Sequence, residues 1–296
     1  MPNFASSSTS TNNTSSMVKG LWQLMRMDKP VGVYLLLWPT LWALWLASLG
    51  MPELDVLIIF VLGVVVMRAA GCVINDIADR KIDGHVKRTH ARPLISGAVT
   101  VKQAWLCFFS LLLIALLLVL QLNIQTVYLS FVALLLAAAY PFMKRYTQLP
   151  QIVLGAAFSW AIPMAFMAVN QHLPSWVWWL YSANLAWTVA YDTQYAMVDR
   201  DDDLKIGVKS TAILFGRYDR LWIGVLQLIT IGCLVIVGTL LHLPWPFSVG
   251  ITVMALMFIY HQHLIKTRTR EACFKAFIQN HWGGLALWLS LVVSFF

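Results

Sequence analysis

Eight of the 13 acidic residues in this 296-residue chain lie in two short segments, so its carboxylate chemistry is concentrated in two places. The two rows of aspartates are Asp76, Asp79 and Asp83 in the first segment, and Asp192, Asp199 and Asp203 in the second. Neighbours within a row are three, four or seven residues apart, which on a helix stacks the carboxylates along one side. Because like charges so arranged repel one another, each row requires cationic compensation.

Two kinds of cation would compensate these rows. The first is neighbouring arginine and lysine, which would make each segment a solvated charged loop with local ion pairs. The second is Mg2+, which prefers six oxygen ligands, usually one or two carboxylates completed by waters and phosphate oxygens. Two rows on separate helices that face one cavity would hold a diphosphate through bridging metal ions. Since acids are scarce elsewhere in the chain, we favour metal binding.

Three basic residues are placed to complete a diphosphate site. Lys144 and Arg145 end an apolar segment on the same predicted face as the acids, where they would neutralise phosphate charge. Arg68 lies inside an apolar segment, about two helical turns before Asn75 and Asp76. An arginine in such a segment is a candidate to bind a substrate carboxylate or phosphate, and the alternative is a pair with an acid of its own bundle.

The elements that must position these residues are membrane-spanning helices. Apolar residues make up 59% of the chain and charged residues 11%, compared with roughly 25% charged residues in soluble domains. The mean hydropathy is +0.71, and continuous apolar runs such as residues 111–120 favour helices over the alternating strands of a membrane β-barrel. We predict an all-α, polytopic membrane bundle of nine transmembrane helices joined in part by Asp-rich loops. The predicted spans are residues 31–49, 55–74, 103–121, 126–143, 151–169, 175–191, 221–241, 246–261 and 277–295.

The distribution of basic residues supports this topology. With nine spans, all lysines and arginines except Arg68 fall on the side of the N-terminus, which the positive-inside rule makes cytoplasmic. Both acidic segments follow even-numbered spans, so the Asp-rich loops open on that same cytoplasmic face. The net charge of +8 is then explained by contact with anionic membrane lipid, and nucleic acid is not needed as a partner.

The remaining features of the sequence point to no further chemistry. The cysteines, Cys72, Cys107, Cys233 and Cys273, lack the spacing of a disulfide framework or a zinc site. Residues 1–17 are rich in Ser, Thr and Asn and lack the basic start and apolar core of a signal peptide, so we expect a disordered leader. Residues 18–296 are expected to form a single transmembrane domain.

The two acidic segments and the nine-span layout resemble the UbiA-type intramembrane prenyltransferases. The matching motifs read Asn75-Asp76-x-x-Asp79-x-x-x-Asp83 and Asp192-x-x-Tyr195-Ala196-x-x-Asp199-x-x-x-Asp203. Residues 27–32, 37–40, 92–94, 140–145 and 199–207 are similar to the branch of this family that prenylates 4-hydroxybenzoate in ubiquinone biosynthesis. The resemblance runs from about residue 20 to the C-terminus.

This resemblance implies a Mg2+-dependent transfer of a polyprenyl group from polyprenyl diphosphate to the ring carbon ortho to the hydroxyl of 4-hydroxybenzoate. It places the enzyme in a bacterial inner membrane and implies no obligate protein partner. Asn75 and both aspartate rows would hold the metal, and the catalytic carboxylates would be Asp79, Asp83, Asp199 and Asp203. Tyr140 and Tyr195 would stack on the allyl cation or the acceptor ring, or serve only as interfacial aromatic residues.

Two other interpretations stay open at this point. A relative within the family would prenylate another acceptor, such as homogentisate or a naphthoate, or would make haem O or chlorophyll. An ion-coupled transporter is the alternative outside enzymes, but it predicts lone acids near the bilayer midplane on broken helices. Here the acids gather at the ends of spans, which favours the enzyme.

Overall fold

The computed structural model describes residues 17–81, 84 and 89–296, and these residues form helices joined by short connections, with no β-strand among them. The predicted leader, except for Met17, lies outside the described residues. The long helices are α2 (Val31–Ser48), α3 (Leu54–Asp79), α5 (Val101–Val119), α6 (Ile124–Tyr146), α9 (Val177–Ile206), α11 (Asp219–Leu240), α12 (Trp245–Leu264) and α13 (Arg270–Ser294). The shorter ones are α4 (Pro93–Ser96), α7 (Pro150–Ser159), α8 (Ala161–Asn170) and α10 (Thr211–Phe215), with 3-10 turns at Gly216–Tyr218 and Ile265–Thr267. The all-α prediction is confirmed.

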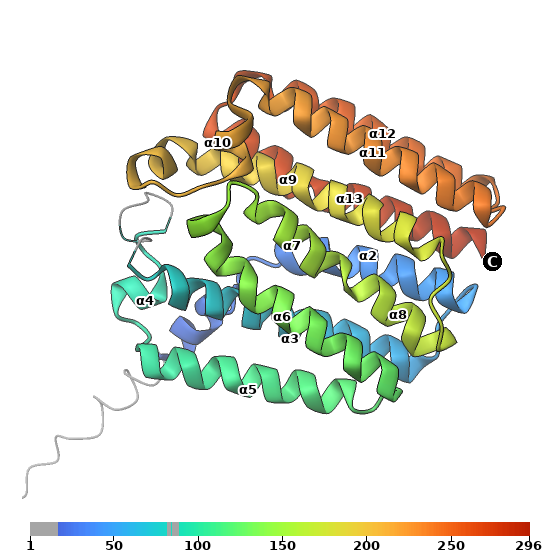
Figure 1. Ribbon diagram of the computed structural model, residues 1–296, viewed down its shortest axis with the longest axis horizontal. Coiled ribbons are helices and arrows are strands. Elements are labelled where there is room, and N and C mark those ends of the chain that lie inside the picture. Colours follow the sequence, from blue (N-terminus) through green and yellow to red (C-terminus); the bar gives the residue numbers. More distant parts are fainter. Residues whose placement is uncertain (1–16, 82–83, 85–88) are drawn as a thin grey trace, which may run out of the picture.

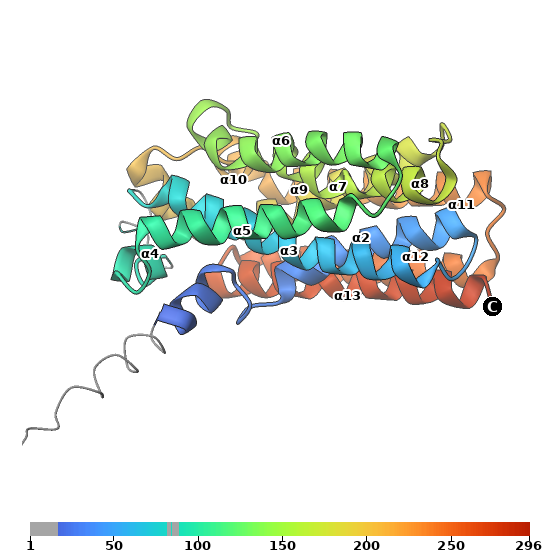
Figure 2. The ribbon, with the colours of Figure 1, turned by 90° about the horizontal axis from the view of Figure 1, so that it is seen from below.

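The long helices run side by side along one axis and form an elongated bundle (Figures 1 and 2). The short helices α4 and α10 both lie at one end of it, on the left in Figure 1. Helix α3 ends toward α4 and helix α9 ends toward α10, so the C-terminal ends of α3 and α9 meet at this end of the bundle.

The described aspartates of both rows lie on helices, which corrects the expectation of Asp-rich loops for all of them except Asp83. Helix α3 continues through Asp76 to Asp79, and helix α9 continues through the whole second segment to Ile206. Helix α9 stops where Gly207 adopts a left-handed conformation with φ of 71°, which only glycine adopts without steric cost. Helices therefore position these five aspartates, and Asp83 lies outside the described residues.

The predicted span at residues 151–169 is divided into two helices that meet at Trp160. Pro163 contributes to the break, because proline has no N–H to donate to the carbonyl of Ser159 four residues earlier. At the same level, the Ser159 hydroxyl accepts a hydrogen bond of 2.9 Å from Asn184 of α9, which fixes the broken segment to the bundle. One predicted helix thus becomes α7 and α8.

Seven helical segments in the described part of the chain are long and apolar enough to cross a membrane. Of the nine predicted spans, those on α9 and α13 do not reach that level of apolarity. Helix α9 packs against α7, α11 and α13 and buries polar side chains, including Asn184, Thr188 and Gln194, which lower its hydropathy. Gln194 and Trp187 are joined through Asn280 of α13 by hydrogen bonds of 2.9 and 3.0 Å.

Three apolar clusters hold the described part of the bundle together: a small one around the C-terminal half of α9, and two larger ones. The largest one joins α2, α8, α9, α11, α12 and α13, and at its centre the rings of Trp42 and Trp187 stack with centroids 5.3 Å apart. Gly284 permits this packing, because a Cβ there would lie 2.7 Å from ring atoms of Trp187 and Trp38. The second cluster joins α3, α5 and the segment before α2. Helices from these two larger clusters line one cavity: α2 and α9 from the largest cluster, and α3 and α5 from the second.

Candidate active site

A cavity of about 1290 Å3 opens between the helices and brings the two aspartate rows together. At one end it is lined by Asn75, Asp76 and Asp79 of α3 and by Asp192, Asp199 and Asp203 of α9. The rest of its lining is mainly apolar and comes chiefly from α2, α3, α5, α6, α7 and α8, with further residues from α9 and α13. Arg68, Tyr140, Lys144 and Tyr195 also line this cavity. Together with the six residues named above, ten predicted site residues thus line one cavity.

The carboxylates of α3 are buried and paired with bases from distant parts of the chain. Asp76 is 2% exposed and accepts hydrogen bonds of 2.9 Å from Arg26, and Arg92 approaches it to 2.9 Å as well. Asp79 is 1% exposed and forms an ion pair with Lys144 of α6. These bases also line the cavity, so they neutralise the row at the place where a phosphate would bind.

Arg26 and Arg92 are functional candidates that the sequence did not single out. Arg92 belongs to one of the segments that resemble the family, residues 92–94, but no role was predicted for its side chain from the sequence. Arg26 follows residues 17–24, which are helical, and its φ of 58° places it in a strained left-handed turn. In this turn its guanidinium also donates 2.8 Å to the Gln23 carbonyl and is thereby directed at Asp76.

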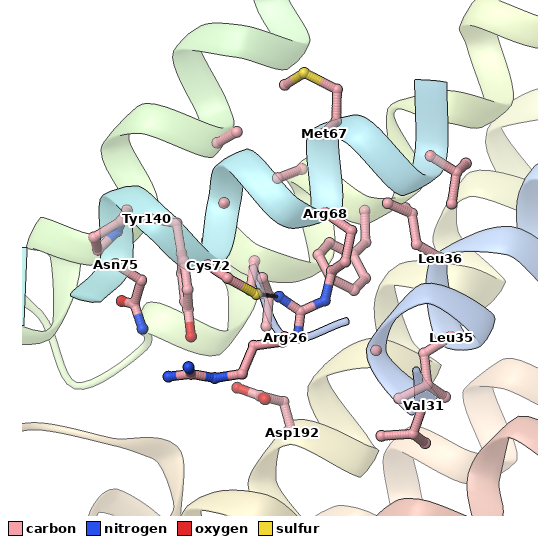
Figure 3. Close-up of a pocket in the computed structure, with 18 of the residues that line it drawn as sticks. Arg26, Val31, Leu35, Leu36, Met67, Arg68, Cys72, Asn75, Tyr140 and Asp192 are labelled. Atoms are coloured by element: carbon pink, nitrogen blue, oxygen red, sulfur yellow. Dashed lines mark hydrogen bonds between the residues drawn. The ribbon is translucent and has the colours of Figure 1, made fainter. Parts of the chain in front are cut away.

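Arg68 is held beside the same cavity, as Figure 3 shows with Cys72, Tyr140 and Asn75 around it. Its guanidinium donates to the Cys72 sulfur one turn further along α3. On the other side it lies against Gly32 of α2, where a Cβ would be only 2.7 Å from Arg68 Cζ. The Arg68 Nε is buried against Gly32 and has no hydrogen-bond partner within the described part of the chain.

Arg145 lies apart from the other predicted basic residues. It is exposed, it is absent from the described residues that line the cavity, and it donates 2.6 Å to the Ala78 carbonyl. The end of α6 is therefore fixed to the end of α3 through Arg145, while Lys144, the preceding residue, points inward to Asp79. Because adjacent residues of a helix point in different directions, Lys144 faces the cavity and Arg145 makes a contact outside it.

The end of helix α9 is fixed from outside the cavity by two groups of ion pairs. Asp219 at the start of α11 is fully buried and accepts from Arg200 at 2.6 Å and from Arg268 at 2.8 Å. Arg270 at the start of α13 donates 2.9 Å to Asp202. The hydrogen bond to Asp219 raises the pKa of Arg268, and the hydrogen bond to Asp202 raises that of Arg270.

The lining of the cavity suits a divalent cation such as Mg2+. Its charged end presents the aspartate carboxylates and the amide of Asn75, which are oxygen donors that hard cations prefer, and the nearby thiol of Cys72 is already engaged by Arg68. Within the described residues no three His, Cys, Asp or Glu side chains form a ready metal cage. Mg2+ does not require one, since one or two carboxylates with waters and phosphate oxygens complete its shell.

Comparisons with known proteins show which family the chain is similar to. A sequence profile described as the UbiA prenyltransferase family matches residues 36–290. Proteins from Salmonella paratyphi B and Salmonella newport, each named 4-hydroxybenzoate octaprenyltransferase, are 60% identical to the chain over 282 residues. These matches cover 95% of this chain and 97% of each relative.

Solved structures share the fold. A UbiA homolog from Aeropyrum pernix K1 in its apo form has a TM-score of 0.79 at 24% identity, covering 88% of this chain and 97% of that one. A UbiA homolog from Archaeoglobus fulgidus bound to GPP and Mg2+ has a TM-score of 0.70 at 18% identity, covering 93% and 99%. At these identities the likeness shows the helical arrangement alone.

Proposed function

The chain belongs to the UbiA prenyltransferase family, and we propose from this that it transfers a polyprenyl group from polyprenyl diphosphate to 4-hydroxybenzoate in ubiquinone biosynthesis. The new bond joins the allylic carbon of the donor to the ring carbon ortho to the hydroxyl, and diphosphate is released. The observation that carries the proposal is the single cavity in which both aspartate rows meet beside a long apolar lining. The relatives at 60% identity support the choice of acceptor.

The charged end of the cavity fits the diphosphate of the donor. Mg2+ held there would neutralise the diphosphate and stabilise it as a leaving group. The residues suited to hold the metal are Asn75, Asp76, Asp79, Asp192, Asp199 and Asp203, together with Asp83 from the sequence motif. Arg26, Arg92 and Lys144, which now neutralise the α3 row, would turn to phosphate oxygens as the donor enters.

The chemical step requires a cavity that protects a cation from water. As the allylic C–O bond breaks, its electrons leave with diphosphate, and the acceptor ring attacks the allylic carbon before losing its proton. The apolar lining from α3, α5 and α6 excludes water from this cation. Tyr195, whose ring centroid lies 4.5 Å from that of Phe277, and Tyr140 present aromatic faces for stabilising it. Arg68 lines the same cavity and would supply a donor for the acceptor carboxylate or a phosphate oxygen.

We also propose that all nine predicted segments cross a bacterial inner membrane, with the N-terminus and the charged end of the cavity facing the cytoplasm. The segregation of lysine and arginine to one side of the nine-span topology supports this orientation. Helices α9 and α13 would cross inside the bundle, where neighbouring helices cover their polar residues from lipid.

Product analysis of the detergent-purified enzyme tests the proposed function. With octaprenyl diphosphate, 4-hydroxybenzoate and Mg2+, mass spectrometry should detect the ring-prenylated acid, and EDTA should remove the activity until Mg2+ is restored. Homogentisate and 1,4-dihydroxy-2-naphthoate serve as acceptor controls. Prenylation of a control acceptor in preference to 4-hydroxybenzoate would contradict the proposed acceptor, and full turnover in EDTA would contradict the metal.

A further inference from the structure

Two glycines on helix α3 face the cavity where the protein has no packing need for them. Gly63 and Gly71 both line the cavity, with Met67 on the same face between them at intervals of four residues. A Cβ built on either glycine meets no atom of the described residues within 4 Å. Because glycine in the interior of a helix lowers helix stability, its presence at two open positions requires another explanation.

Other glycines of the bundle show what a packing role looks like. A Cβ on Gly155 would lie 3.1 Å from the Leu185 carbonyl oxygen, and one on Gly284 would collide with two tryptophans. Those glycines let helices approach closely. Gly63 and Gly71 instead leave unfilled space on the cavity side of α3, and a larger side chain there would project into the cavity.

The two open positions lie at different distances from the charged end. With a rise of 1.5 Å per residue, Gly71 lies ~12 Å from Asp79 along α3, and Gly63 lies ~24 Å from it. The lining beyond Gly63 is apolar and includes Ile59 and Phe60 of α3. The cavity therefore extends as a continuous apolar space well beyond the part that the diphosphate and the reacting carbon occupy.

We propose that Gly63 determines how long a donor chain the enzyme accepts, by keeping the distal part of the cavity open to the far isoprene units. Gly71 keeps space for the units next to the diphosphate, so it affects every donor. This inference rests on the proposed function, since it concerns the polyprenyl donor of that reaction. It assigns a specificity role to a residue without a side chain.

A series of donors of increasing length tests this role. The Gly63→Leu enzyme is assayed with geranyl, farnesyl, geranylgeranyl and octaprenyl diphosphates at saturating 4-hydroxybenzoate. We expect kcat/KM for octaprenyl diphosphate to fall about tenfold or more, while that for geranyl diphosphate stays within about twofold of the wild type. Gly63→Ala should give a smaller loss with the same dependence on length.

Gly232 provides a matched control, because it is also a helix-interior glycine with open space for a Cβ, but it lies exposed on α11 away from the cavity lining. Gly232→Leu should leave all donors unchanged, and Gly71→Leu should weaken all of them. An unchanged length profile in Gly63→Leu, or an equal loss for every donor, would overturn the role of Gly63. Absence of product from the wild-type enzyme with every donor would instead overturn the proposed function.

Discussion

Helices α3 and α9, which carry the aspartates of the two rows, differ in where their ion pairs lie relative to the cavity. On α3, Asp76 and Asp79 pair with Arg26, Arg92 and Lys144, and all three bases line the cavity. On α9, the ion pairs of Arg200 and Arg270 lie on the outer side of the helix, away from the cavity lining. The first set lies in the proposed diphosphate site, whereas the second set fixes the helix in the bundle.

Three consecutive aspartates on α9 show this division at the scale of single residues. Asp203 lines the cavity, Asp202 is buried and pairs with Arg270, and the side chain of Asp201 is 74% exposed. Since successive helical residues point about 100° apart, one run of acids faces the cavity, an internal contact and the exposed surface, where Asp201 also approaches Arg270 to 3.7 Å. We therefore expect changes on the cavity side to alter chemistry and changes on the outer side to alter stability.

Removing a cavity-facing carboxylate should have the largest effect. Asp79→Ala or Asp199→Ala should lower kcat/KM about a thousandfold or more, because each removes a charge aimed at the leaving diphosphate. Steady-state assays with octaprenyl diphosphate and Mg2+ measure the loss. Asp201→Ala is the matched control on the exposed side and should keep nearly full activity. Comparable losses in Asp201→Ala and Asp199→Ala would remove the distinction between the two sides of α9.

Lys144 and Arg145 allow the same comparison, between a residue that faces the cavity and one outside it, to be made with basic side chains. Lys144→Ala should raise the KM for the donor about tenfold, because it removes a cation that faces the diphosphate site. Arg145→Ala, which removes the contact to the Ala78 carbonyl, should change that KM less. Donor titrations at fixed acceptor concentration measure both values. A larger KM effect in Arg145→Ala would return Arg145 to the diphosphate site that the sequence predicted for it.

Local periodicity made the carboxylate rows predictable, whereas their partners depend on distant contacts. The spacing of the aspartates is a property of one helix, and the sequence alone predicted one site for both rows and Lys144, whose described members line one cavity. Arg26 lies 50 residues from Asp76 in the chain, and Arg268 lies 49 residues from Asp219. No periodic pattern connects such pairs, because they are set by the packing of separate helices.

The fold shows the same limit. Each predicted span overlaps a helix of the described chain, because long apolar runs are a strong local signal. The break at Trp160 was missed although Pro163 lies beside it, because a proline does not by itself end a helix here: Pro39 and Pro141 lie within the unbroken helices α2 and α6. The burial of polar residues on α9 was not predictable, because it depends on which helices surround α9 in the bundle.

Breaking the outer contact of α9 at Asp219 should affect stability more than catalysis. Asp219→Asn leaves Arg200 and Arg268 without their shared carboxylate, and losing one partner of such a buried pair costs about 3 kcal/mol. We expect a lower Tm in detergent, measured by thermal unfolding, with the donor KM close to that of the wild type. An unchanged Tm together with a raised donor KM would assign Asp219 to the ligand site instead.

The pair between Arg270 and Asp202 should give the smallest effect of the four. The Arg270 side chain is 34% exposed and that of Asp202 7%, so solvent screens part of the attraction, and Arg270→Ala should cost about 1 kcal/mol. Lys275→Ala removes the same charge from an exposed position further along α13 and serves as the control. Because the pair is electrostatic, the difference in Tm between the two variants should shrink at high salt. A difference that persists in high salt would mean that Arg270 holds α9 mainly by packing of its aliphatic stem.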